Sequence, residues 1–277
     1  PRLPRPCVLL FEGGKHGVAG GGLTFQEILL APNGGSFQEM LDKAKNVFAG
    51  LQSQLNYPLG VEGGLAAPLK EEEILDLISQ HTTEPIGIDV AASSFFKQGK
   101  YYLAGQEISA DKLLSFYQTL QKKYNILFLE DPFAQDDIAS WRKGLYEVCP
   151  HTSLYEGRPH TPHTSLVVGD DLTATNCERI KMAKKQNLCD AVIIKPNQIG
   201  TVTETIEAAG LAKKFGWKII VSHRAGETND SFIADLAVGL GADFIKAGGL
   251  TQSVRMAKYN RLLEIEKGLL GNQHNNF

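Results

Sequence analysis

The sequence has little of what stabilises a small secreted fold or a membrane span. Only four of its 277 residues are cysteine, and no two of them have Cys-x-x-Cys spacing. A chain of this length does not need disulfides, so we expect reduced thiols in a cytoplasmic protein. There is no run of about 18 apolar residues, which argues against a membrane-spanning helix. Residues 1–6 are not followed by the apolar stretch of a secretory signal, and we interpret them as a linker at the edge of a longer protein.

An excess of charge of one sign is also missing. Lys and Arg number 28 against 31 Asp and Glu, which gives a net charge of −3. We therefore expect neither nucleic acid nor a membrane surface as a partner. Hydrophobic residues make up 43% of the chain and charged residues 21%, which allows a sizeable core and excludes disorder throughout.

A nucleotide-binding loop is the third missing feature. The glycine-rich stretch at 13–22 fits neither the Gly-x-Gly-x-x-Gly pattern nor the Gly-Lys-Ser/Thr pattern. We therefore reject a nucleotide site there.

The alternation of apolar and amphipathic segments predicts the fold. Apolar runs predict strands at 86–89, 125–130, 165–170, 191–195, 218–222 and 243–246, and helical periodicity predicts helices at 111–123, 137–148, 176–185, 202–215, 231–240 and 253–267. Before them, extended segments at 7–11 and 23–31 precede helical segments at 36–55 and 71–80. Apolar strands separated by helices predict a parallel sheet covered on both faces, and six βα units in series favour a barrel over two domains. The predicted fold class is α/β, a TIM-like barrel in which ββαα precedes six βα units, forming one domain over residues 1–277.

Charged residues stand where the six predicted βα strands end. In chain order they are Asp89, Glu130, Asp170, Lys195, the pair His223–Arg224, and Lys246. The carboxyl ends of barrel strands meet at the face where active sites are built. One charged strand end is usually just solvated, but three acidic ends followed by three basic ones are not explained by solvation. The pattern therefore predicts an active site at this face.

The residue types at these strand ends indicate the chemistry. Three carboxylates without His or Cys form a hard-oxygen site, for which Mg²⁺ is preferred over Zn²⁺. Two lysines and an arginine suit a phosphorylated or carboxylated substrate. A lysine beside a divalent cation and a second lysine is expected to have a lowered pKa, as a general base requires. The predicted reaction is proton abstraction next to a carboxylate, with the metal holding the resulting dianion.

Longer motifs resemble the C-terminal barrel domain of the enolase (phosphopyruvate hydratase) family over nearly the whole chain. They are Phe-Gln-Glu at 25–27, Gly-Val-Glu-Gly-Gly at 60–64, Ser-Ser-Phe-Phe at 93–96, Leu-Glu-Asp-Pro-Phe-Ala at 129–134, Gly-Asp-Asp-Leu-Thr at 169–173, Lys-Pro-Asn-Gln-Ile-Gly-Thr at 195–201, Val-Ser-His-Arg-Ala-Gly-Glu-Thr at 221–228 and Phe-Ile-Ala-Asp-Leu at 232–236. The family barrel also begins ββαα. The resemblance implies a glycolytic, Mg²⁺-dependent lyase that interconverts 2-phosphoglycerate and phosphoenolpyruvate plus water. Lys as base with Mg²⁺ is a known pairing in this superfamily.

The resemblance also implies a set of site residues. They are Asp89, Glu130 and Asp170 as Mg²⁺ ligands, Lys195 and Glu62 as catalytic residues, and His16, Gln26, Glu27, His223, Arg224 and Lys246 as substrate-binding residues. By this resemblance Lys195 takes the C2 proton and Glu62 helps the C3 hydroxyl leave as water. Lys246 contacts the substrate carboxylate, and Arg224 binds its phosphate.

The chain departs from the family pattern at several positions. Val61 replaces an Asp next to Glu62, Ala225 replaces a Ser, and Lys15 replaces a Ser. An insertion at 149–165 contains three histidines, which we interpret as an exposed loop rather than a zinc site. The altered loops suggest a divergent member, of the sperm-type paralogue of animals.

The largest departure is that the N-terminal domain of enolases, which caps the site, is missing here. We therefore expect an isolated domain, weakly active or inactive by itself, because an uncapped site admits water. The capping domain of the parent chain and a second copy in a homodimer are the expected protein partners.

Two other functions stay open at this point. One is an enolase-derived scaffold or binding protein without turnover, favoured by Val61 and Ala225. The other is an acid-sugar dehydratase of the same superfamily, which the phosphate-directed Ser-His-Arg segment at 222–224 and the single base Lys195 disfavour.

Overall fold

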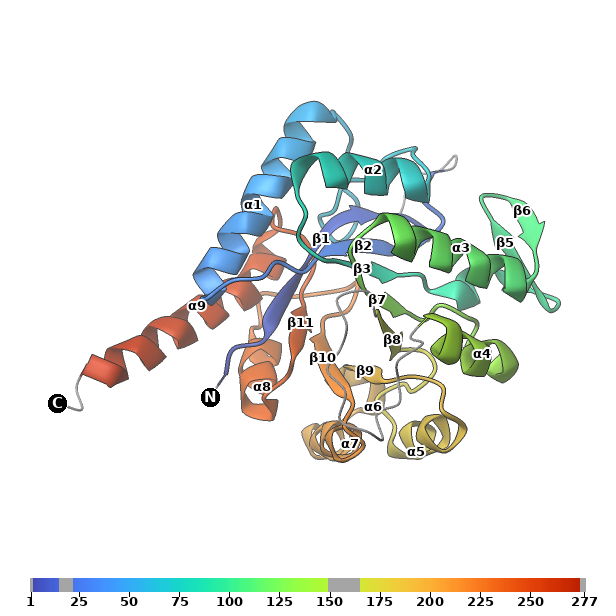
Figure 1. Ribbon diagram of the computed structural model, residues 1–277. Coiled ribbons are helices and arrows are strands. Elements are labelled where there is room, and N and C mark those ends of the chain that lie inside the picture. Colours follow the sequence, from blue (N-terminus) through green and yellow to red (C-terminus); the bar gives the residue numbers. More distant parts are fainter. Residues whose placement is uncertain (1, 15–21, 149–164, 275–277) are drawn as a thin grey trace.

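A closed barrel of eight strands is the centre of the fold (Figure 1), in a computed structural model that describes residues 2–14, 22–148 and 165–274. The strands are β1 (Arg5–Glu12), β2 (Glu27–Leu30), β3 (Ile86–Asp89), β7 (Ile126–Glu130), β8 (Leu166–Gly169), β9 (Ala191–Ile194), β10 (Lys218–Ser222) and β11 (Phe244–Lys246). Around the barrel they follow the order β1-β11-β10-β9-β8-β7-β3-β2. β2 is antiparallel to both β1 and β3, and all other neighbours are parallel. The predicted TIM-like α/β barrel, with ββαα before six βα units, is confirmed.

Helices surround the barrel (Figure 1). They are α1 (Phe37–Gln54), α2 (Glu71–His81), α3 (Ala110–Lys123), α4 (Ile138–Val148), α5 (Cys177–Gln186), the short α6 (Pro196–Ile199), α7 (Val202–Lys214), α8 (Phe232–Leu240) and α9 (Ser253–His274). Local sequence sets several starts, because the side chains of Ser36, Asn176 and Thr201 accept hydrogen bonds from the first-turn N–H groups of α1, α5 and α7. α9 continues well past its predicted end at 267 and projects away from the barrel (Figure 1).

The apolar core has two layers. The larger layer lies between the strands and the surrounding helices. The smaller one fills the barrel and consists of Cys7, Leu9, Leu29, Ala31, Phe128, Leu166, Val168, Ala191, Ile193, Ile220 and Phe244. Phe128 lies directly over Gly87, where an added Cβ would come within 2.1 Å of the Phe128 ring. Glycine at position 87 is therefore required by the packing of the barrel interior.

One small sheet was not predicted. β4 (Phe96–Lys97), β5 (Lys100–Leu103) and β6 (Gln106–Ile108) form an antiparallel sheet between β3 and α3. Its two turns, Gln98–Gly99 and Ala104–Gly105, have positive φ at all four positions, which is typical of two-residue hairpin turns. Strands of two to four residues hold too little alternation to be recognised from sequence.

The N-terminal edge needs a correction. We expected residues 1–6 to form a linker, but β1 begins at Arg5, which together with Pro6 pairs with β11. The reason is tertiary: the N–H of Arg5 donates to the Asp243 carbonyl at 3.0 Å, and its guanidinium donates to the carbonyls of Ala31 and Pro32. His16, Lys15 and residues 149–164 of the inserted loop lie outside the described residues.

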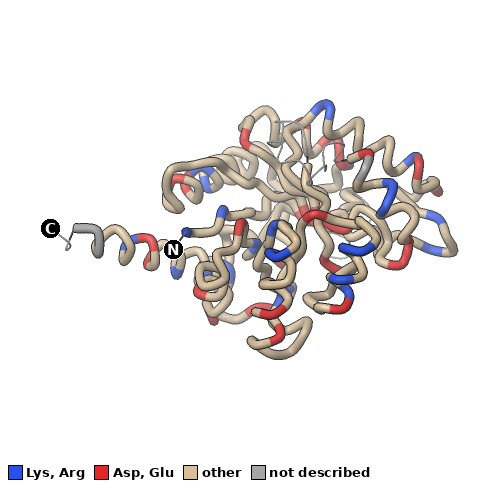
Figure 2. The backbone as a smooth tube through the Cα atoms, turned by 60° about the horizontal axis from the view of Figure 1, so that its bottom comes forward, with Lys and Arg blue, Asp and Glu red and all other residues tan. Residues whose placement is uncertain are grey.

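The described part of the chain has a surface of mixed charge. Lys, Arg, Asp and Glu alternate over the helices rather than gathering by sign (Figure 2). None of the described helices is long and apolar enough to cross a membrane. Cys7, Cys177 and Cys189 are free thiols, as expected.

Candidate active site

The carboxyl ends of the barrel strands surround a polar cavity of about 260 Å³. It is lined by Gln26, Glu27, Glu62, Asp89, Ala91, Asp131, Asp170, Asp171, Lys195, Gln198, Ser222, His223, Arg224, Ala225 and Lys246. The structure thus brings together every predicted site residue that it describes, except that the fully buried Glu130 lies behind the lining. His16 is outside the described residues.

Lys246, the last residue of β11, lies among three buried carboxylates. Its Nζ is 2.7 Å from Glu27 Oε2, 2.7 Å from Asp89 Oδ2 and 3.0 Å from Glu130 Oε2. Burial, followed by repulsion from Asp89, raises the pKa of Glu130. Burial lowers the pKa of Lys246, but the three carboxylates outweigh it and the net shift is upward.

Lys195 lies between β9 and α6, where its Nζ forms an ion pair with Asp170. Gln198 donates to the other oxygen of Asp170 at 2.9 Å. Burial lowers the pKa of Lys195, but attraction from Asp170 and then Glu130 gives a net upward shift. The two carboxylates by themselves stabilise the ammonium form, and the lowered pKa that we expected for this base beside a divalent cation stays a prediction.

This donor set fits a hard divalent cation. Among the residues that the structure describes, four buried carboxylates, those of Glu27, Asp89, Glu130 and Asp170, are paired with two ammonium groups, those of Lys195 and Lys246. An excess of buried negative charge is costly unless a cation balances it. Carboxylate oxygens are the ligands that Mg²⁺ prefers, whereas imidazole and thiolate groups suit Zn²⁺.

Two carboxylate-rich groups have ligand atoms within 4.8 Å of one another in the described chain: Asp131–Asp170–Asp171 and Glu27–Glu62–His223. In the first, both oxygens of Asp131 already accept backbone N–H groups, from Asp170 at 2.9 Å and Asp171 at 2.7 Å. The predicted Asp89–Glu130–Asp170 set is not among these groups, and Lys246 Nζ lies between Asp89 and Glu130.

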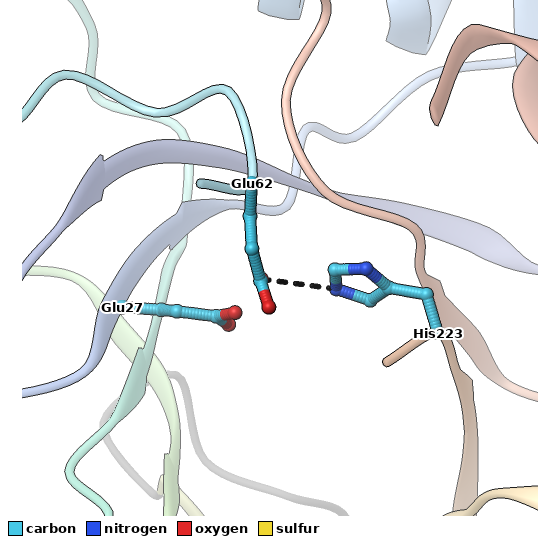
Figure 3. A group of neighbouring side chains, drawn as sticks. All are labelled: Glu27, Glu62 and His223. Carbon is cyan, nitrogen blue, oxygen red and sulfur yellow. Dashed lines mark ion pairs between the residues drawn. The ribbon is translucent and has the colours of Figure 1, made fainter. Parts of the chain in front are cut away.

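The second group brings the side chains of Glu27, Glu62 and His223 together (Figure 3). His223 Nε2 lies 3.6 Å from Glu62 Oε2, and both side chains are buried. The neighbouring Glu62 carboxyl group favours the protonated form of Glu27 by repulsion. Burial raises the pKa of Glu27 to about 7, with Lys246 opposing and Glu62 adding to the shift. Burial and the charge of Arg255 lower the pKa of His223, which is therefore neutral.

Glu62 is held in place by a residue that we did not single out from the sequence. The buried carboxylate of Glu12, at the end of β1, accepts from the N–H of Glu62 at 3.0 Å and from that of Gly64 at 2.9 Å. A Cβ on Gly60 would lie 2.3 Å from Glu12 Cδ, so the loop can close on this carboxylate only with glycine there. Gly63 has a φ of +84°, which also favours glycine.

The rim of the cavity carries Arg224 and two of the departures that we noted, Ala225 and Val61. Arg224 is exposed, and its Nη1 donates to Asn197 Oδ1 at 3.3 Å. Ala225 lines the cavity, and its carbonyl accepts from Arg255 Nη2 at 2.7 Å. Val61 is 59% exposed beside Glu62, and its carbonyl accepts from Gln252 Nε2 at 3.1 Å.

Comparison with known proteins decides the family. A family model described as enolase, C-terminal TIM barrel domain, matches residues 2–276. The chain belongs to the enolase family. Relatives named enolase come from Ehrlichia ruminantium (strain Gardel), 38% identical over 281 residues, from Mastigamoeba balamuthi, 40% identical over 303 residues, and from Sulfurisphaera tokodaii, 40% identical over 280 residues. The alignments cover 96%, 99% and 95% of this chain but 63%, 65% and 64% of the relatives, so the chain spans less than two thirds of their length.

Three functional residues of this enolase barrel were missed at the sequence level. Asp131 follows Glu130 directly and could have been found as a second acidic residue at the end of the same strand. Glu12 ends β1, but its partner loop is 50 residues away, and no spacing rule connects the two. Arg255 lies on α9, 32 residues from His223, and periodicity alone makes it an ordinary surface helix residue.

Proposed function

We propose that the parent protein is a Mg²⁺-dependent phosphopyruvate hydratase, a carbon–oxygen lyase that interconverts 2-phosphoglycerate with phosphoenolpyruvate and water. One observation carries this proposal: Lys195 and Glu62 face the same cavity from opposite sides of the barrel. Lys195 follows β9, whereas Glu12 of β1 and the neighbouring strand β2 hold the Glu62 loop and Glu27, across the ring from β9. A base and an acid on opposite sides of a substrate suit the removal of a proton and a hydroxyl from adjacent carbons.

The proposed reaction needs two proton transfers. Lys195 Nζ, in its neutral form, takes the proton from C2. Glu62 delivers a proton to the C3 hydroxyl. The C3–O bond then breaks, water leaves, and the electron pair from C2 forms the C2–C3 double bond. The reverse direction uses the same residues in their opposite protonation states.

Asp89, Glu130 and Asp170 would hold the metal in this proposal. When bound, Mg²⁺ would offset the carboxylate charges that raise the pKa of Lys195 and the negative charge that develops on the substrate carboxylate. Lys246 lies beside the same carboxylates and would contact that end of the substrate. The exposed Arg224 at the rim suits the phosphate, which remains charged throughout.

The protein partners of this site are also part of the proposal. Val61 and Arg224 are exposed at the rim, which supports a capping domain of the parent chain over the cavity and low activity of residues 1–277 alone. A homodimer, a cytoplasmic location and membership of the sperm-type paralogue stay predictions from the sequence.

A scaffold without turnover is the second candidate. Val61 favours it, since an apolar side chain 59% exposed at the rim is better suited to a protein contact than to catalysis. Ala225 favours it as well, because no hydroxyl is available at this position of the cavity lining.

Formation of phosphoenolpyruvate separates the two candidates. It would be followed by ultraviolet absorbance, with Mg²⁺ and with chelator, for the parent protein and for residues 1–277. We expect metal-dependent activity in the parent that Lys195→Ala lowers by about 10²–10⁴-fold, as for loss of a general base. Lys181→Ala, on the exposed face of α5 where Lys181 pairs with Glu178, is the matched control and should leave activity unchanged. No activity in a folded, Mg²⁺-binding parent would favour the scaffold.

A further inference from the structure

A buried arginine on the C-terminal helix lies directly behind the active-site histidine. Arg255 of α9 is 1% exposed and forms no hydrogen bond or ion pair with a carboxylate of the described residues. Its Nη1 contacts His223 Nδ1 and donates to the Arg224 carbonyl at 2.7 Å, and its Nη2 donates to the Ala225 carbonyl at 2.7 Å. The guanidinium group therefore binds three consecutive residues of the loop after β10.

The contact with His223 fixes where the imidazole proton lies. A guanidinium group can only donate hydrogen bonds, so Nδ1 of His223 must be the acceptor. The ring is neutral because it is buried beside this cation, so its single proton is on Nε2. Nε2 is the atom that faces Glu62 Oε2 at 3.6 Å (Figure 3).

This arrangement also decides against a metal ion at Glu27–Glu62–His223. A histidine binds a metal through an unprotonated ring nitrogen. The nitrogen of His223 that faces the two carboxyl groups carries the proton, and its other nitrogen is covered by Arg255. The group is therefore not suited to holding a cation.

We propose that Arg255 is a positioning residue that holds His223 in the Nε2–H tautomer, so that the Nε2–H group always faces Glu62. The proposal depends on the function proposed above in one respect, which is that Glu62 acts as the acid. With the proton fixed on Nε2, the imidazole presents its positive edge to Glu62 Oε2 at 3.6 Å and keeps this carboxyl group in one orientation at the cavity. Arg255 thus acts on the proton transfer through His223, without touching the substrate.

A neighbouring residue gives a matched control. Lys258, one turn further along α9, is also 1% exposed. It donates to the Thr228 carbonyl at 2.6 Å and pairs with Glu227 at 2.7 Å, so it supports the same loop. Within the part of the chain that the structure describes, it forms no hydrogen bond with His223. Loss of Lys258 should therefore disturb the loop without changing the tautomer.

The test is nitrogen NMR of the protein labelled with ¹⁵N-histidine at neutral pH, with the His223 signals assigned by their loss in His223→Gln. In the unmodified protein we expect Nε2 in the protonated, pyrrole-like range and Nδ1 in the unprotonated, pyridine-like range. Arg255→Met should give a mixture of tautomers, and Arg255→Lys, which keeps a cationic donor, should restore the Nε2–H form. Lys258→Met should leave the tautomer as it is.

Two outcomes would overturn the proposal. One is an Nδ1–H or doubly protonated His223 in the unmodified protein, a result that needs no variant to fold. The other is an unchanged tautomer in a folded Arg255→Met variant. In the active parent, kcat of Arg255→Met should fall by about 10²-fold through misplacement of the acid, with recovery in Arg255→Lys. Because the NMR result needs no turnover, absence of lyase activity would refute the proposed function and leave this inference to stand or fall by itself.

Discussion

Removing the carboxylate of Glu12 should release the loop that carries Glu62. In the unmodified protein the Glu12 carboxylate lies 3.0 Å from the N–H nitrogen of Glu62 and 2.9 Å from that of Gly64. In Glu12→Ala both N–H groups lose this buried acceptor. Each buried donor left without a partner costs about 1–3 kcal/mol, so we expect a loss of about 2–6 kcal/mol, or of about 1–3 kcal/mol if water reaches one of the two. Urea unfolding would measure this loss, and phosphoenolpyruvate formation by the parent protein should fall with it.

Glu12→Gln is the conservative variant, and it should cost less. Its amide oxygen can replace Oε1, which lies within hydrogen-bonding distance of both N–H groups, at 3.2 and 2.9 Å. Burial raises the pKa of Glu12, which means that the folded state holds the carboxyl proton of Glu12 more tightly than the unfolded state does. The stability of the unmodified protein should therefore fall as pH rises from about 4.5 through the folded-state pKa, and that of Glu12→Gln should lack this component.

Glu84→Ala provides a control for the same kind of contact. Glu84 also accepts a backbone N–H, from Asn33 at 2.7 Å, but its side chain is 20% exposed and water can replace it. We expect less than about 1 kcal/mol there. If Glu12→Ala were no more destabilising than Glu84→Ala, the argument that Glu12 holds the Glu62 loop would be refuted.

Three further predictions concern packing, thiols and metal. Gly87→Ala should destabilise the protein by about 1–3 kcal/mol through overpacking, whereas Gly210→Ala, in open space on α7, should stabilise it by up to about 1 kcal/mol; equal urea midpoints would contradict this. A thiol reagent should label the half-buried Cys177 in the native protein but Cys7, whose burial raises its pKa to about 12, only after unfolding, as peptide mapping would reveal. Mg²⁺ at 100 times its Kd for the unmodified chain should stabilise that chain by about 2.7 kcal/mol. A similar gain in Asp170→Asn at the same Mg²⁺ concentration would rule out Asp170 as a ligand.

The barrel itself could be predicted because its signals are local. Each strand from β7 to β10 is an apolar run bounded by a helical segment, and each strand end carries a charged or histidine residue that the parallel topology must bring to one face. The same signals placed Asp89, Lys195 and Lys246 around one cavity. The small β4–β6 sheet was missed because its strands are too short for a pattern to form.

What could not be predicted depends on contacts between distant segments. Arg5 belongs to β1 because of carbonyl groups at the end of β2, and Glu12 and Arg255 reach loops 50 and 32 residues away. The upward shift in the pKa of Lys195 depends on such contacts as well, since Asp170 and Glu130 lie near enough to outweigh burial. Geometry of this kind follows from the closed barrel and not from any single segment.

Exchange of the C2 hydrogen tests the central claim most directly, because it separates the two proton transfers. The parent protein would be incubated with 2-phosphoglycerate deuterated at C2 and Mg²⁺, and loss of deuterium to water would be followed beside phosphoenolpyruvate formation. We predict that Lys195→Ala abolishes both, and that Glu62→Gln still exchanges C2 deuterium while product formation fails. Exchange at the unmodified rate in Lys195→Ala would contradict the assignment of Lys195 as the base, and with it the proposed division of roles across the barrel.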